Sequence, residues 1–208
     1  MKFLTVLFLV LPVVPCFGQT APANWTGQYA PCEHHNDLLG RGHLNIALKV
    51  STANPILAEQ FENALEFWGG VLDLDWHEVD AADACSMQLV DGTPALFDFC
   101  TCMSARSQLP DRDDFQGLIA FNPRFKLSKD EMFIDSVHEI GHVLGLAHNP
   151  DDSSVMFSFG LQKPAWLDLS DLDALAARHS LRPGILGTDG KWNVLVRLPE
   201  HVANRRLP

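Results

Sequence analysis

The sequence predicts a single α/β (α+β) domain, and three observations support this fold class. The chain has 208 residues, a length that suits one domain with a short extension. Its first half alternates a strand pattern, a long amphipathic helix pattern and further strand patterns. Its second half contains two more helix patterns, each preceded by a capping signal. We therefore expect strands and helices to share one hydrophobic core.

The first strand is expected at Leu44 to Val50, where apolar and polar residues alternate. Asn54 and Pro55 then supply the N-cap and the first position of a long helix. We interpret the apolar stripe of this helix as core packing, and we expect Gly69 and Gly70 to end it. The stripe consists of Leu57, Phe61, Ala64, Leu65 and Trp68.

Three shorter strands are expected downstream of the long helix. The first two lie at Asp75 to Val79 and at Cys85 to Val90, and an Asp-Gly turn follows the second. The third is the apolar run from Gly117 to Phe121, which is closed by Pro123. The strands and the long helix together give the first half of the chain its α/β character.

A second helix is expected to begin at Ser128, because Ser128 and Glu131 have the spacing of a capping box. Its apolar face would fix it to the core and consists of Phe133, Ile134, Val137, Ile140, Val143 and Leu144. A last helix is expected to begin at Ser170, with Asp173 as the capping partner, and to end near Pro183.

Residues 138 to 148 read HEIGHVLGLAH and have the spacing of a metal site. His138 and His142 are four residues apart, so on a helix they project from the same face and can share one ion. Glu139 lies beside them, within reach of a water molecule activated by that ion. Gly145 can adopt a positive φ where the helix ends, which would bring His148 to the same metal. Three histidines leave a tetrahedral zinc one open position, as catalytic rather than structural sites do.

This string fits the pattern H-E-x-x-H-x-x-G-x-x-H and resembles the metzincin zinc peptidases. Met156 follows His148 closely and is similar to the Met-turn methionine that lies beneath the ligands in that clan. The short gap resembles matrixins more than astacins or adamalysins. Over about Leu44 to Leu181, the resemblance implies a metzincin-type zincin fold: a twisted mixed sheet with a long helix, the zinc helix, a Met-turn and a C-terminal helix.

The resemblance implies a zinc-dependent endopeptidase with one catalytic zinc and with Glu139 as the general base of peptide hydrolysis. In matrixins a strand upstream of the zinc helix forms the sheet edge that pairs with extended substrate, and Leu118, Ile119 and Ala120 are similar to it in position. An ordinary edge or inner strand, without a role in substrate binding, is the alternative for these three residues. Ser158 stands where astacins have a tyrosine and matrixins usually have a proline, which leaves side-chain preference open. The alternative function is a weakly active or inactive secreted binding protein on the same scaffold.

The first 18 residues have the composition of a signal peptide, with Lys2 followed by an apolar run. We expect cleavage before Gln19, a secreted protein and no transmembrane segment, because no later run is long enough to span a bilayer. Residues 19–43 would be an N-terminal segment and a candidate short propeptide. Residues 44–182 would be the catalytic domain, and residues 183–208 a C-terminal extension with a strand-like stretch at Trp192 to Leu198.

Removal of the signal peptide leaves an even number of cysteines in an oxidising compartment, which predicts two disulfides. A bond between Cys100 and Cys102 would close a strained loop, so each is expected to pair with Cys32 or Cys85, in an order the sequence leaves open. The sequon at residues 24–26 is a candidate glycosylation site.

The formal net charge of −11 argues against nucleic acid as a partner, because phosphate binding requires clustered Lys and Arg. The expected partner is a protein or peptide substrate, and the expected state is a monomer. Three aspartates upstream of the third short strand could hold calcium, although a solvated acidic turn is the favoured interpretation. They are Asp111, Asp113 and Asp114.

Overall fold

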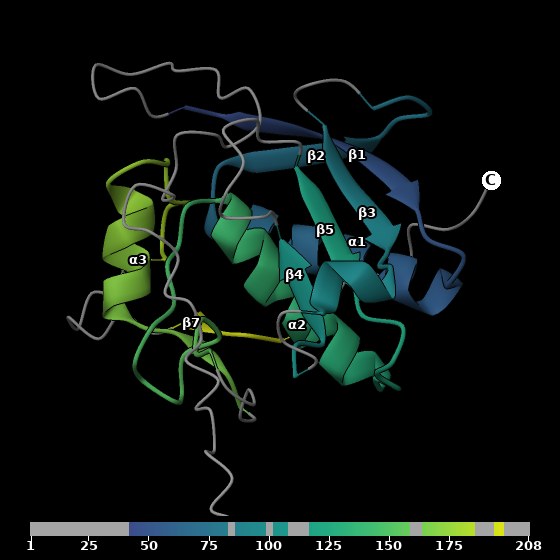
Figure 1. Ribbon diagram of the computed structural model, residues 1–208. Helices are drawn as coiled ribbons and strands as arrows, with labels where there is room; N and C mark the ends of the chain where they lie inside the picture. The colour runs from purple at the N-terminus through teal and green to yellow at the C-terminus, as the bar shows by residue number, and fades with distance from the viewer. Residues whose placement is uncertain are drawn as a thin grey trace, which may run out of the picture.

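The computed structural model describes residues 42–82, 86–98, 102–107, 117–158, 164–185 and 194–197. A five-stranded sheet and two long helices form most of this part of the chain (Figure 1). The helices are α1 (Pro55–Val71), α2 (Lys129–Val143) and the shorter α3 (Leu169–Ala176), which stands at the side of the domain in Figure 1. The predicted α/β class is correct.

The sheet is mixed and has the order β2-β1-β3-β5-β4. Its parallel strands are β1 (Leu44–Ser51), β2 (Leu74–Glu78), β3 (Met87–Asp91) and β5 (Leu118–Phe121). The short strand β4 (Ala105–Ser107) runs antiparallel to β5 and forms an edge of the sheet. A 3₁₀-helix, η2 (Pro94–Phe97), lies between β3 and β4. Apart from shifts of one or two residues at their ends, β1, β2, β3 and β5 lie where the sequence placed them.

The expectation that Leu118, Ile119 and Ala120 lie at the edge of the sheet is wrong, and they occupy the inner-strand position that was the alternative. These residues belong to β5, which pairs with β3 on one side and with β4 on the other. The backbone groups that would bind a peptide are therefore committed to neighbouring strands over most of β5. The edge position belongs to β4, a strand of three residues that has no alternating pattern to reveal it.

Helix α1 begins as predicted, because the Asn54 side chain accepts hydrogen bonds from the backbone N–H groups of Ile56 and Leu57. It does not end at Gly69, however, but continues to Val71. The helix is held past its glycines by packing, since Trp68 and Val71 are buried in the core. Tertiary contacts thus outweigh the cost of two helical glycines, about 1 kcal/mol each.

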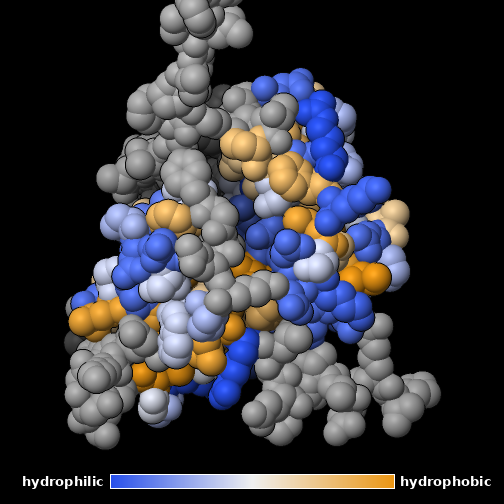
Figure 2. All heavy atoms as spheres, turned by 90° about the horizontal axis from the view of Figure 1, so that it is seen from below, coloured by the Kyte–Doolittle hydropathy of each residue, from blue (hydrophilic) through white to orange (hydrophobic). Residues whose placement is uncertain are grey.

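One hydrophobic core unites the inner face of the sheet with the facing sides of α1 and α2. Its largest fully buried side chains include Trp68, Phe61 and Ile140. On the face seen in Figure 2, apolar and hydrophilic residues alternate in small patches over the described part of the surface. Among the described residues, no helix has the length and apolar character needed to cross a membrane.

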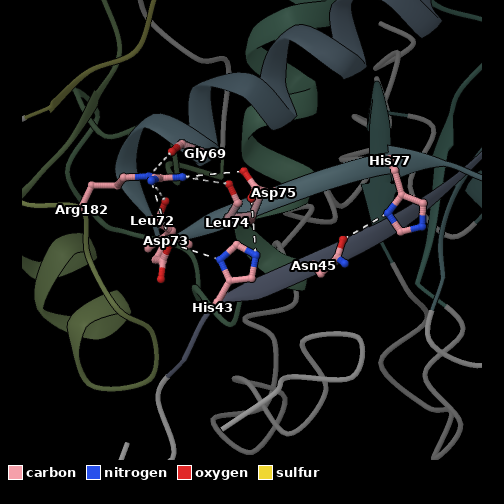
Figure 3. A network of polar contacts seen from close by, with 9 residues as sticks. All are labelled: His43, Asn45, Gly69, Leu72, Asp73, Leu74, Asp75, His77 and Arg182. Carbon is pink, nitrogen blue, oxygen red and sulfur yellow. Dashed lines mark hydrogen bonds and ion pairs between the residues drawn. The ribbon is translucent and has the colours of Figure 1, made fainter. Parts of the chain in front are cut away.

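Arg182 ties the segment after α3 to the end of α1 and the start of β2 (Figure 3). The Arg182 Nε donates to the carbonyl oxygens of Gly69 at 2.8 Å and Leu72 at 3.0 Å. Its guanidinium also lies 3.9 Å from carboxylates of both Asp73 and Asp75. The hydrogen bonds matter more than the ion pairs here, because these charges are solvent-exposed and screened.

Helix α3 starts earlier than predicted, and it ends at Ala176, well before the expected end near Pro183. Its N-cap is Asp168, which forms a capping box with Asp171, rather than Ser170 with Asp173. Both pairs have the three-residue spacing, so the sequence alone could not choose between them. Part of the strand-like stretch in the C-terminal extension is a strand: β7 (Val194–Leu195) pairs antiparallel with β6 (Trp166–Leu167).

Several predictions fall outside the described residues. These are the signal peptide, the candidate propeptide up to residue 41, the sequon, three of the four mature cysteines and the aspartates at 111, 113 and 114. The disulfide pairing therefore stays a prediction, and nothing in the described part of the chain supports a calcium site.

Candidate functional site

Helix α2 carries most of the predicted site on a rigid, well-anchored element. Its capping box is formed as expected, with the Ser128 hydroxyl accepting from the Glu131 N–H and the Glu131 carboxylate accepting from the Ser128 N–H. Asp130 and Glu131 in the first turn also complement the helix dipole. Side chains fixed on such a helix can hold a metal geometry more precisely than side chains on a loop.

His138, His142 and His148 converge on one point, and the three could hold a metal ion. One nitrogen from each ring can be chosen so that all three lie within 4.8 Å of one another. His138 and His142 are the closest pair, with 3.0 Å between their Nε2 atoms. Gly145 has φ 98°, as the bend toward His148 requires.

In His138 and His142, a hydrogen bond made by one ring nitrogen leaves the other nitrogen facing the common point. His138 Nδ1 donates to the Val155 carbonyl oxygen at 2.6 Å, and His142 Nδ1 donates to the Leu146 carbonyl oxygen at 2.8 Å. With the proton held on Nδ1, the lone pair of each ring lies on Nε2, the atom that faces the partner histidine. Metal-binding histidines are commonly oriented in this way by a backbone carbonyl. The donor set fits zinc.

The environment also keeps these rings neutral, the form that binds metal. Burial lowers the pKa of His138, and it lowers the pKa of His142 well below the usual 6.5. Burial, together with the neighbouring His138, lowers the pKa of His148 to about 4. A cluster of imidazoles that resists protonation is ready to accept a cation near neutral pH.

Glu139 lies between these ligands and strand β4. It is buried, and burial raises the pKa of its carboxyl from 4.5 to about 7. The backbone and side chain of Ser107 and the positive charge of Arg106 oppose this rise. A carboxyl with a pKa near neutrality can both take up and release a proton under physiological conditions.

Met156 forms the floor of the site, as its position in the sequence predicted. It is completely buried, and its thioether approaches Gly141, which lies on α2 between His138 and His142. A Cβ atom at Gly141 would lie only 2.6 Å from the Met156 Sδ and 3.3 Å from Cζ2 of Trp68. Gly141 is therefore a site residue that sequence reasoning missed: it lets the methionine come close to the helix.

A scan against models of protein families matches the matrixin model to residues 45–179. The matched region is most of the chain and contains every residue of the site described above. The chain belongs to the matrixin family. No curated protein matches its sequence. Family membership and the histidine cluster agree that the site suits zinc, the metal that matrixins use.

In this matrixin, strand β4 runs beside α2 and adds polar groups to the site. Ser104, just before β4, hydrogen-bonds to the Asp135 carboxyl, and Ser107 at its other end faces Glu139. Burial raises the pKa of Asp135 to about 6, an effect that the Ser104 hydrogen bond opposes. No local sequence pattern indicates these contacts, because β4 and α2 are brought together only by the tertiary fold.

The Met-turn of the matrixin domain is held by a buried polar network centred on Asp171 of α3. One Asp171 oxygen accepts from the Ser154 hydroxyl at 2.8 Å, and the other accepts from the Asn149 amide at 3.0 Å. Ser154 in turn accepts from the Met156 N–H at 2.9 Å. Helix α3 thus fixes both the methionine and the residue that follows His148.

Proposed function

We propose that this matrixin is a secreted zinc-dependent endopeptidase with Glu139 as its general base. The observation that carries the proposal is the convergence of three histidines beside one buried carboxyl, that of Glu139. His138, His142 and His148 would hold the metal. The same arrangement without Glu139 would bind zinc but would lack a group to move protons.

Bound zinc would supply an acidified water molecule and would polarise the carbonyl of the scissile bond. Glu139 accepts the proton of the attacking water and then delivers it to the leaving amine. Its burial and its position next to His138 suit both steps, because each requires a carboxyl close to the reacting atoms. The reaction is hydrolysis of a peptide bond without a covalent enzyme intermediate.

Strand β4 is the element we assign to substrate binding, in place of β5. It forms one edge of the described sheet, and it lies against α2 near Glu139. An extended peptide added to this edge would be held by backbone hydrogen bonds, which do not depend on its side chains. Such a peptide would present a backbone carbonyl toward the catalytic carboxyl.

The proposal of secretion is supported by the sequence alone. The apolar run of the first 18 residues and the even number of mature cysteines both suit export to an oxidising compartment. Release of the mature chain into the medium, with Gln19 as its first residue, would be the expected outcome in a secreting host.

The mature protein should cleave members of a peptide library and lose this activity when a chelator removes zinc. Glu139→Gln should lower kcat/KM by at least about 100-fold while zinc remains bound, because the amide cannot accept the proton. Glu131→Gln is the matched control: it makes the same change on the same helix, and glutamine can still complete the capping box. Undiminished cleavage by Glu139→Gln would contradict the mechanism. A zinc-loaded wild-type protein that cuts no peptide would favour a binding protein.

A further inference from the structure

The bend between the second and third histidines has an unusual set of hydrogen bonds. Three consecutive backbone carbonyls in this bend each accept a hydrogen bond from a side chain. The Leu144 oxygen accepts from His179 Nε2 at 2.7 Å, and the Gly145 oxygen accepts from Arg178 Nη1 at 3.3 Å. The third carbonyl, that of Leu146, accepts from His142, as described above.

These bonds come in addition to those that the backbone makes for itself. The N–H groups of Leu144, Gly145 and Leu146 bond back to α2, to the carbonyls of Ile140, His142 and Gly141 respectively. Both the N–H groups and the carbonyl groups of the bend are therefore held by hydrogen bonds. The carbonyls at a helix C-terminus have no partner within the helix, so side-chain donors here satisfy groups that would otherwise need water.

The two external donors lie next to each other, just after the end of α3. His179 is almost completely buried, with 2% of its surface exposed, and Leu144 is buried as well. The amino-terminal end of α3 meanwhile holds Asn149 through Asp171. The segment that contains His148 is thus attached to α3 on both sides of the histidine.

We propose that Arg178 and His179 are positioning residues for the third metal ligand. They bind the Leu144 and Gly145 carbonyls, fix the bend at the C-terminus of α2 and so hold His148 at the point where His138 and His142 converge. The inference rests on metal binding by the three histidines and does not depend on peptide hydrolysis. It makes the segment just after α3 a determinant of zinc affinity.

The test measures the affinity of the full mature chain for Zn²⁺ by competition with a chromophoric chelator. His179→Leu, which fills a similar buried space but removes the donor, should weaken zinc binding about tenfold, in the range found when partners of metal ligands are removed. His179→Gln retains an N–H donor of similar reach and should stay within about threefold of wild type.

The decisive comparison repeats His179→Leu in a His148→Ala background. If His179 acts through the third ligand, the substitution should change zinc affinity by less than about twofold once that ligand is absent. A purely structural role would weaken binding equally in both backgrounds. Unchanged affinity in His179→Leu alone, or an equal loss in both backgrounds, would overturn the proposal.

Arg182→Ala is the matched control, because it removes a side chain that binds backbone carbonyls outside the bend. Arg182 also donates to backbone carbonyls, but at the end of α1 (Figure 3). Its removal should lower the melting temperature and leave zinc affinity unchanged; a tenfold loss of zinc affinity there would overturn the assignment. If His179→Leu does not fold, Arg178→Ala tests the proposal in its place. This substitution should weaken zinc binding about threefold in the wild-type background and leave it unchanged in the His148→Ala background.

Discussion

Substitution of Gly141 by alanine tests whether the methionine floor requires a glycine in the zinc helix. The added methyl would lie 2.6 Å from Sδ and 3.2 Å from Cε of Met156, both inside ordinary van der Waals contact. Met156 is fully buried, and the added methyl would also meet Cζ2 of Trp68, so neither neighbour can move into solvent. Overpacking of this kind costs about 1–3 kcal/mol.

Alanine also brings a benefit, because it is a better helix former than glycine by about 1 kcal/mol. The expected net effect of Gly141→Ala on the free energy of unfolding is therefore a loss of up to about 2 kcal/mol. The matched control is Gly70→Ala in the last turn of α1, where a Cβ meets nothing within 4 Å. That variant should gain stability by up to about 1 kcal/mol.

Urea unfolding of the metal-free protein would measure both variants against wild type. Met156→Ala and the double variant then isolate the contact. Met156→Ala alone should cost about 2–5 kcal/mol, and the double variant should cost at least about 1 kcal/mol less than the sum of the two single losses. The reasoning would be refuted if Gly141→Ala stabilised the protein as much as Gly70→Ala, or if the two site substitutions were additive.

Three further predictions concern protonation, the Met-turn network and a helix cap. Because the site histidines have lowered pKa values, zinc affinity should fall less than about 100-fold between pH 7 and pH 5. Three histidines of pKa 6.5 would instead lose about 10⁴-fold in affinity, and chelator competition across this pH range distinguishes the two results. Asp171→Ala leaves the Ser154 hydroxyl and the Asn149 amide without this acceptor and should cost about 1–3 kcal/mol by urea unfolding; no loss would contradict the network. Asn54→Ala should cost about 1 kcal/mol, with zinc affinity unchanged.

The sequence identified features that depend on a few neighbouring residues. The caps at Asn54 and Ser128 and the bend at Gly145 are examples, and the structure confirms all three. Each depends on hydrogen bonds or backbone angles within about one helical turn, so residue type and spacing contain the needed information. Where two caps compete locally, as at Asp168 and Ser170, spacing alone was not enough.

Predictions that depended on residues far apart in the sequence were less accurate. The end of α1 was placed too early, because burial of Val71 holds the helix past its glycines. Strand β5 was expected at an edge, because nothing local in residues 105–107 marks the strand that covers it. Contacts between segments far apart in the chain are invisible to periodicity.

The string at residues 138–148 is sufficient to place two ligands on one helix face, with the proposed general base beside them, since helical geometry sets their relation. Tertiary structure decided the rest of the site. It brought β4 beside Glu139, Met156 against Gly141, and Arg178 and His179 onto the bend that leads to His148. These contacts join residues separated by about 15 to 35 positions, and only the packing of the whole domain brings them together.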